Sequence, residues 1–143
     1  MKLNQIMTRD VRTCTPDSSV VDAAKIMASL DCGAVPIVAG EKPVGIVTDR
    51  DIVLRCVAKG MDINRAKCQD CMTSDVVTAA PDMDAHEAAD LMARKQIRRL
   101  PVVENGRLVG IVALGDLATV NIHVDEAGEA LSSISIPSRP QAH

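Results

Sequence analysis

The phrase VGIVTDRD at residues 44–51 decides the fold, because nearly the same phrase, VGIVALGD, returns at residues 109–116. The second copy has Ala113 where the first has Thr48, while the final aspartate is kept as Asp116. The apolar half of each phrase is typical of a buried strand, and the polar half is typical of a helix start. The two phrases therefore mark the same strand–helix junction in two halves of the chain.

The repetition extends well beyond this phrase. A shift of 65 positions (71 − 6) aligns residues 6–53 with residues 71–118 without a gap. Roughly 18 of about 48 aligned positions are identical, which indicates two copies of one structural unit. We therefore expect repeat 1 over residues 1–60, repeat 2 over residues 61–125, and a C-terminal helix or flexible tail over residues 126–143.

Each repeat carries the same structural signals in the same order. A Thr-x-x-Pro-Asp turn comes first, followed by Ser19 or Asp84, each with an acidic residue three positions later. This capping-box pattern predicts amphipathic helices that end near Leu30 and Lys95. Two short apolar runs joined by a tight turn predict a hairpin, and a second helix begins after each VGIV run. The predicted fold class is α+β, with the order strand, helix, strand, strand, helix in each repeat.

Composition restricts the classes of function. A chain of 143 residues, 47% of them hydrophobic, is long enough to bury a proper core. The net charge of -3 and the absence of Phe, Trp and Tyr argue against a nucleic-acid partner. No apolar run approaches the roughly 20 residues that span a bilayer, and the N-terminus lacks the apolar core of a signal peptide. We expect a cytoplasmic protein with no membrane partner.

A tandem pair of such units, each ending in a G-h-h-T/S-x-x-D/N phrase, resembles the cystathionine-beta-synthase (CBS) domain pair, or Bateman module. The resemblance covers nearly the whole chain and is closest in kind to the small stand-alone CBS proteins of bacteria. It implies two β-α-β-β-α repeats packed with pseudo-two-fold symmetry. It also implies a regulatory module that binds an adenosine-containing ligand, such as AMP, ATP, S-adenosylmethionine or NAD, in the cleft between the repeats.

The Thr48-x-x-Asp51 phrase can be interpreted in two ways. As a ligand site, the helix start favours a phosphate, the Thr48 hydroxyl can donate to it, and Asp51 can accept both ribose hydroxyls, as the family does. Gly45, without a Cβ, would let the ligand approach the strand. As a structural feature, the phrase is simply a capping box. Because Asp116 is retained without a capping threonine, we expect the aspartate to do more than complete a cap.

Arg98 and Arg99 precede the first hairpin strand of repeat 2. The resemblance implies that basic residues at this place reach across to the phosphate held by Thr48 and Asp51. The alternative is a solvated surface pair, and because neighbours on a strand face opposite ways, one arginine alone could reach the ligand. With no aromatic residue to stack on the base, we expect contacts from aliphatic side chains and backbone near Val11, Thr13, Ile37 and Ile46.

The mirror cleft should be weaker or empty. It has Asp116, but Ala113 replaces the threonine, and Gly33 and Ala34 stand where repeat 2 has its arginines. We therefore expect one tightly bound nucleotide per chain. The other expected partners are a second copy, in a homodimer formed through the alanine-rich helix faces DAAKIMA and EAADLMA, and an unidentified protein target.

Two further functions stay open. One is a dimerising scaffold for protein interactions that binds no nucleotide; the other is a thiol or metal sensor built on Cys68-x-x-Cys71. The 65-residue shift aligns these cysteines with Leu3 and Ile6, which favours buried cysteines acting as small hydrophobes. No second set of metal ligands and no nucleophile paired with a base is evident, so we expect no metal site, no catalytic residue and no catalytic cofactor.

Overall fold

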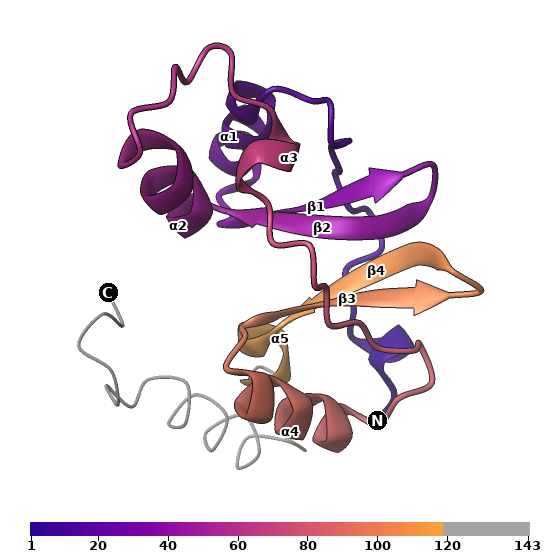
Figure 1. Ribbon diagram of the computed structural model, residues 1–143. Helices are drawn as coiled ribbons and strands as arrows, with labels where there is room; N and C mark the ends of the chain where they lie inside the picture. Colours follow the sequence, from indigo (N-terminus) through magenta and orange to yellow (C-terminus); the bar gives the residue numbers. More distant parts are fainter. Residues whose placement is uncertain (119–143) are drawn as a thin grey trace. The chain divides into compact units, whose positions relative to one another are not determined.

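The computed structural model describes residues 1–118, and its elements follow the internal repeat (Figure 1). The predicted tail at residues 126–143 lies outside the described residues. The first half contains η1 (Leu3–Gln5), α1 (Val20–Leu30), β1 (Ala34–Ala39), β2 (Lys42–Thr48), α2 (Asp49–Asp51) and η2 (Ile52–Val57). The second half contains α3 (Cys68–Cys71), α4 (Ala85–Lys95), β3 (Arg99–Glu104), β4 (Arg107–Ala113) and α5 (Leu114–Ala118). Within residues 1–118, no helix is both long and apolar enough to cross a bilayer.

The two long helices begin and end where the sequence predicts. The Ser19 hydroxyl accepts a hydrogen bond from the Asp22 N–H at 3.0 Å, and the Asp84 carboxylate accepts one from the His86 N–H at 2.9 Å. Each helix ends in a residue with positive φ, Asp31 at 51° and Gln96 at 54°. Both residues take the left-handed conformation that stops a helix, which a short polar side chain such as that of Asp31 tolerates well.

Both predicted hairpins are present as two-stranded antiparallel pairs, β1 with β2 and β3 with β4. A bulge between Ile37 and Val38 shifts the register of the first. The second turns through Asn105 and Gly106, which have φ of 54° and 79°. Two consecutive residues with positive φ form the type of turn that matches the twist of paired strands, and the Asn-Gly pair is the sequence best suited to it.

The first strand of each repeat is reduced to a single parallel bridge, Cys14 with Ile37 and Ala79 with Val102. The ladder stops after Cys14 for a chemical reason. The next N–H, of Thr15, is bonded to the Ser18 hydroxyl at 2.9 Å, and Pro16 has no N–H to donate. The Thr-x-x-Pro-Asp turn that precedes the helix therefore limits the strand before it.

The compact units of the structure do not coincide with the sequence repeats at residues 1–60 and 61–125. One unit, here called the β1–β2 unit, contains residues 10–77 and 105–108. The other, the β3–β4 unit, contains residues 1–9 and 78–104 and continues from residue 109. In it, Thr8 pairs with Ile111, and in the β1–β2 unit Thr73 pairs with Ile46. The first residues of each repeat, 1–9 and 61–77, thus belong to the unit that holds the other repeat's hairpin.

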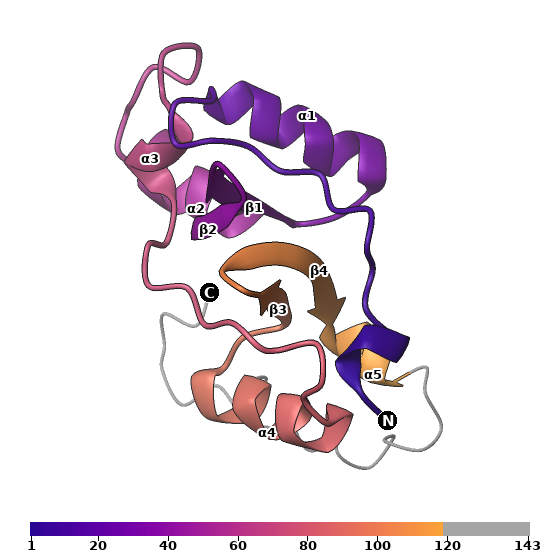
Figure 2. The same cartoon turned by 90° about the vertical axis from the view of Figure 1, so that its right-hand side faces the viewer.

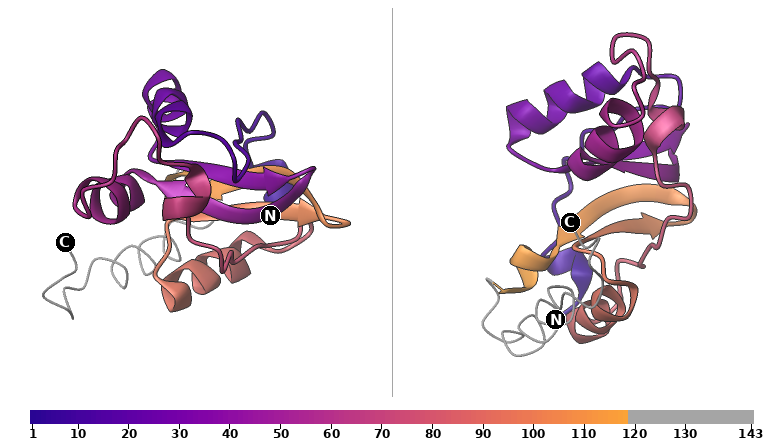
Figure 3. Two further views of the ribbon diagram at one scale, coloured as in Figure 1. Left: turned by 45° about the horizontal axis from the view of Figure 1, so that its top comes forward. Right: turned by 60° about the vertical axis from the view of Figure 1, so that its left-hand side comes forward.

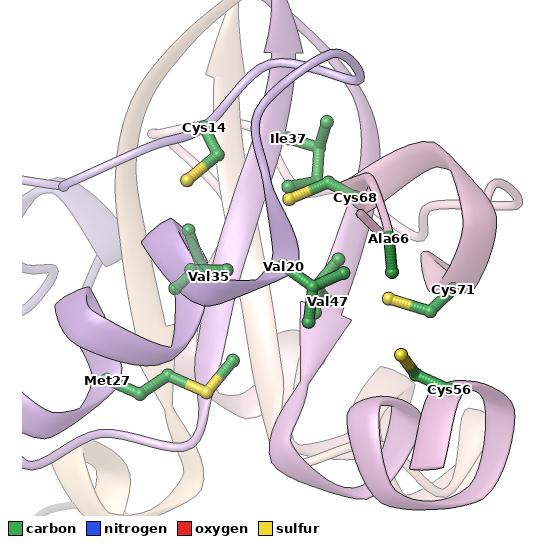
Figure 4. Close-up of a cluster of buried hydrophobic side chains, with 11 residues drawn as sticks. Cys14, Val20, Met27, Val35, Ile37, Val47, Cys56, Ala66, Cys68 and Cys71 are labelled. Carbon is green, nitrogen blue, oxygen red and sulfur yellow. The ribbon is translucent and has the colours of Figure 1, made fainter. Parts of the chain in front are cut away.

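Each unit buries its own apolar residues. In the β1–β2 unit, α1 covers one face of the hairpin (Figure 2), and Figure 4 shows the core that α1, the hairpin, η2 and α3 form together. This core consists of Cys14, Val20, Ala23, Met27, Val35, Ile37, Val47, Cys56, Ala66, Cys68 and Cys71. In the β3–β4 unit, α4 lies along its hairpin (Figure 3). The fully buried residues of this unit include Leu3, Ala85, Ala88, Met92, Leu100, Val102, Val112 and Leu117.

Candidate functional site

The junction between β2 and α2 holds the two residues at the centre of the predicted ligand site. Thr48 is the N-cap of α2, and its hydroxyl accepts a hydrogen bond from the Asp51 N–H at 3.1 Å. The Asp51 Oδ2 accepts in return from the Thr48 N–H at 3.0 Å. The structural interpretation of this phrase, a reciprocal capping box, is therefore confirmed.

The Asp51 carboxylate can accept more hydrogen bonds than the cap uses. Its Oδ1 lies 3.8 Å from the Nε of Arg55, one turn further along the chain. Each carboxylate oxygen can accept two hydrogen bonds, so one bond from Thr48 and one ion pair leave acceptor positions open. The side chain is 12% exposed, so those positions are confined to a small patch of surface. Such a carboxylate can accept from a pair of neighbouring hydroxyls.

The helix that follows Thr48 is not the regular α-helix that the sequence predicts. After three α-helical residues it continues as the π-helix η2, in which the Ala58 N–H bonds the Val53 carbonyl at 2.8 Å, five residues back. Few peptide dipoles are aligned behind Thr48 in α-helical geometry, which weakens the dipole as a source of phosphate affinity. Short π-helical turns recur at functional sites. No sequence signal for this turn was available.

The equivalent junction in the β3–β4 unit closes without a threonine. The Asp116 Oδ2 accepts from the Ala113 N–H at 2.7 Å, the same bond that Asp51 makes to Thr48. Backbone capping is thus one structural reason for an aspartate at position 116. The presence of Asp116 therefore does not by itself indicate a ligand, and a ligand role for Asp51 has to rest on other features.

Packing within the β1–β2 unit requires a glycine at position 45. A Cβ at this position would lie 2.6 Å from the Met72 Sδ and 3.0 Å from the Thr73 carbonyl oxygen. The side that was expected to admit a ligand is therefore covered by residues 72–73. Gly110 is in the same situation in the β3–β4 unit, with the Met7 Sδ at 2.6 Å. The paired glycines are required by the segments that cross the two hairpins.

The residues expected to contact the base are not all available. Ile37 is fully buried in the core of the β1–β2 unit and cannot contact a ligand from the surface. Val11, Thr13 and Ile46 are half-buried in the same unit, and Ile46 exchanges backbone hydrogen bonds with Thr73. Three of the four predicted positions therefore keep some accessible surface.

The predicted arginines belong to the other unit. Arg98 is exposed just before β3, and its carbonyl accepts from the Leu114 N–H at 2.8 Å. Arg99 is the first residue of β3 and is half-buried. At the position equivalent to Arg98, Gly33 faces an acid, because a Cβ there would lie 3.2 Å from the Asp49 Oδ2. The two repeats thus carry opposite charges around corresponding positions.

The cysteines pack as the repeat alignment predicts. Cys68 and Cys71 are 0% and 1% exposed, and Figure 4 shows their thiols directed toward Cys14 and Cys56 respectively, not toward each other. Burial raises the pKa of Cys68 to about 12 and that of Cys71 to about 11, so both thiols stay protonated at neutral pH. Within residues 1–118, no three His, Cys, Asp or Glu side chains are grouped to hold a metal ion.

Comparisons with known proteins agree on one family. The family model for the CBS domain matches residues 3–57 and again residues 68–123. The CBS domain-containing protein YhcV of Bacillus subtilis (strain 168) is 43% identical over 129 residues, which cover 90% of this chain and 91% of YhcV.

Two solved structures extend the likeness to the fold. A signal-transduction protein with CBS domains from Burkholderia ambifaria MC40-6 has a TM-score of 0.79 at 31% identity, with 85% of this chain and 94% of that chain covered. The CBS domain pair of protein MJ0100, in complex with 5′-methylthioadenosine and S-adenosyl-L-methionine, has a TM-score of 0.76 at 30% identity and covers 85% and 95%. The chain therefore belongs to the CBS domain family and is a CBS pair, a module of a regulatory domain family.

Proposed function

We propose that this CBS pair is a regulatory module that binds an adenosine-containing nucleotide of the AMP or ATP type, with Asp51 accepting the ribose hydroxyls. The supporting observation is the state of the Asp51 carboxylate, which the Thr48 N–H fixes at 3.0 Å while acceptor positions stay open. The complex of the MJ0100 pair with two adenosyl compounds supports the same ligand class.

The other roles follow from the chemistry of each group and from the family resemblance. The Thr48 hydroxyl accepts from the Asp51 N–H, so its own proton remains available for a phosphate oxygen. Arg98 and Arg99 would supply the positive charge from repeat 2, as the family resemblance implies. Val11, Thr13 and Ile46 would contact the base. The proposed module regulates and does not catalyse.

We expect about one nucleotide per chain. The corresponding position beside Asp116 has Ala113 in place of a hydroxyl, and the Asp49 carboxylate beside Gly33 would repel a phosphate. A charge-assisted hydrogen bond contributes roughly 1.5 to 3 kcal/mol, so each one missing lowers affinity about tenfold or more. The second position should stay empty or accept a ligand through its ribose and base alone.

Calorimetry with AMP, ATP and S-adenosylmethionine tests the proposal. Asp51→Ala and Arg99→Ala should each weaken nucleotide binding at least about tenfold, whereas Asp116→Ala should leave it nearly unchanged. Asp51→Asn is the matched variant, because an amide oxygen still accepts from the Thr48 N–H while the negative charge is lost. Two equal sites per chain, or greater sensitivity to Asp116 than to Asp51, would contradict the assignment. No heat with any of the three compounds would favour the scaffold function.

The homodimer remains part of the proposal. Of the alanine-rich faces, α1 keeps Ala24 and Ala28 exposed, whereas Ala88 and Ala89 of α4 are buried within their unit. The apolar residues that η2 leaves exposed are Val53, Leu54 and Val57. Burying them against a second copy would stabilise a dimer. Sedimentation equilibrium should show a dimer at tens of micromolar, and a monomer there would remove this part.

A further inference from the structure

Arg55 makes a connection that the ligand chemistry alone does not require. Its Nε lies 3.8 Å from the Asp51 Oδ1, and its Nη1 donates to the Met72 carbonyl at 3.2 Å. One guanidinium therefore joins the proposed ribose-binding carboxylate to residue 72, which is 17 positions further along the chain. A planar guanidinium has donors on several sides, so it can serve both groups at once.

The segment that Arg55 contacts, residues 72–77, follows α3 and is the connector that leads from the β1–β2 unit to residue 78 of the β3–β4 unit. Its residues 72–73 are seated on β2 by a pair of backbone bonds: the Ile46 N–H donates to the Thr73 carbonyl at 3.0 Å, and the Thr73 N–H donates to the Ile46 carbonyl at 2.9 Å. The Met72 side chain fills the space that Gly45 leaves. Backbone bonds, a side chain in a fitted space and the Arg55 contact thus hold this connector together.

The Asp51 end of this chain of contacts is equally fixed. Its Oδ2 is held by the Thr48 N–H, so a shift of the carboxylate would disturb both the cap and the contact to Arg55. A ribose that donates its hydroxyls to the remaining acceptor positions would immobilise the carboxylate without displacing Arg55. At the position 65 residues after Arg55, the second repeat has Val120, which cannot make such a link.

We propose that Arg55 is a positioning residue that couples the Asp51 carboxylate to the docking of residues 72–73 on β2. Ligand binding at Asp51 then tightens the docking of this connector on β2, and a docked connector raises affinity at Asp51 by the same factor, because such coupling is reciprocal. The ligand part rests on the function proposed above, whereas the link between Asp51 and the connector does not. Since Arg55 is about half exposed (48%), the coupling should be a few-fold effect.

Amide hydrogen exchange at Ile46 and Thr73, followed by NMR on the full chain without ligand, tests the link itself. Arg55→Met should speed exchange at both amides about threefold, since a solvent-exposed ion pair and its hydrogen bond contribute effects of this order. Asp51→Asn should do the same while keeping the cap, and the double variant should be no faster than either single one. Arg55→Lys should restore part of the protection. Unchanged exchange, or fully additive effects, would overturn the link.

Arg65→Met is the matched control. Arg65 pairs with Asp62 at 3.7 Å in the same unit, but its side chain is 89% exposed, and it should leave Ile46 and Thr73 unaffected. AMP at saturation should then slow exchange at Thr73 in the natural chain but not in Arg55→Met. If AMP binds and Thr73 does not respond, the coupling is wrong. If none of AMP, ATP and S-adenosylmethionine binds by calorimetry, the proposed function is wrong, while the ligand-free comparison still decides the link.

Discussion

The two strand–helix junctions of this molecule are built from the same phrase but are closed differently. At the first, Thr48 and Asp51 exchange two hydrogen bonds; at the second, Asp116 alone bonds the Ala113 N–H. The aspartate therefore has structural value at both junctions, with or without a ligand. A ligand function must be argued from what differs between the junctions: the Thr48 hydroxyl, the contact to Arg55, whose equivalent in the sequence is Val120, and the charges of Asp49 beside Gly33 and of Arg98.

The largest expected difference between the units concerns the buried thiols. The folded chain holds the pKa of Cys68 at about 12 and of Cys71 at about 11, above the ordinary value of 9.0. As pH rises past 9, the unfolded chain loses these protons while the folded chain keeps them, so the free energy of unfolding should fall through pH 9 to about 11. The expected loss is at most about 1.4 kcal/mol per pH unit and thiol.

Urea unfolding at pH 8 and pH 10.5 measures this loss, with the Cys68→Val, Cys71→Ala double variant as the comparison. The variant should fold and should lose distinctly less stability between the two pH values, because valine and alanine do not titrate. Equal losses in the two proteins would mean that other groups cause the alkaline instability.

The second comparison concerns the glycines of β2 and β4, whose replacement by alanine should destabilise the two units by similar amounts. Gly45→Ala and Gly110→Ala each push a Cβ to 2.6 Å from a methionine sulfur and 3.0 Å from a carbonyl oxygen. We expect each to lower the free energy of unfolding by about 1 to 3 kcal/mol. Gly115→Ala is the control, since open space surrounds that position in α5 and alanine favours a helix by up to about 1 kcal/mol. A harmless Gly45→Ala would indicate that residues 72–73 are not seated on β2.

Removing the shared aspartates tests what the two junctions have in common. Asp51→Ala and Asp116→Ala each delete a side-chain acceptor for a backbone N–H at a helix start. Both should therefore cost about 1 to 2 kcal/mol in urea unfolding. Asp116→Ala with unchanged stability would show that its 2.7 Å bond contributes nothing, and the ligand interpretation of the retained aspartate would then regain its force.

The smallest effect should come from exchanging the residues that differ. Thr48→Ala makes the first junction resemble the second and should cost about 0.5 to 1 kcal/mol, while Ala113→Thr adds a cap and should stabilise by a similar amount. Thermal unfolding monitored by circular dichroism in the far ultraviolet can follow both, since the chain has no tryptophan or tyrosine. Changes of the same sign would mean that the two junctions are not equivalent in geometry.

The sequence predicts the helices and strands of this fold well. It does not predict that the first residues of each repeat belong to the unit that holds the other repeat's hairpin. Both long helices and both hairpins are where the caps, turns and apolar runs indicate, because those signals are local. The docking of residues 72–73 on β2 depends on a contact between Gly45 and Met72, and nothing in either residue alone indicates it. The short helix α3 was likewise not predicted.

The candidate site could be predicted only where its signals are local in the sequence. The Thr48–Asp51 pair could be identified from its spacing, and both its acceptor and its donor bonds are present. The full burial of Ile37 follows from the way α1 and α3 close over the hairpin, which periodicity does not specify. The roles of Arg55 and of the π-helix depend on tertiary contacts, so a single sequence gives no signal for them.

The placement of residues 1–9 in the β3–β4 unit affects the order in which parts of the chain can fold during synthesis. Thr8 pairs with Ile111, so during synthesis residues 1–9 wait for a partner about 100 positions behind them. At 5 to 20 residues per second, that wait is about 5 to 20 seconds. During it, the β1–β2 hairpin and α1 can already form from residues 20–48, but their unit lacks Thr73 until the connector emerges. Residues 1–9, although made before the β1–β2 hairpin, are therefore among the last of the described residues to reach their place.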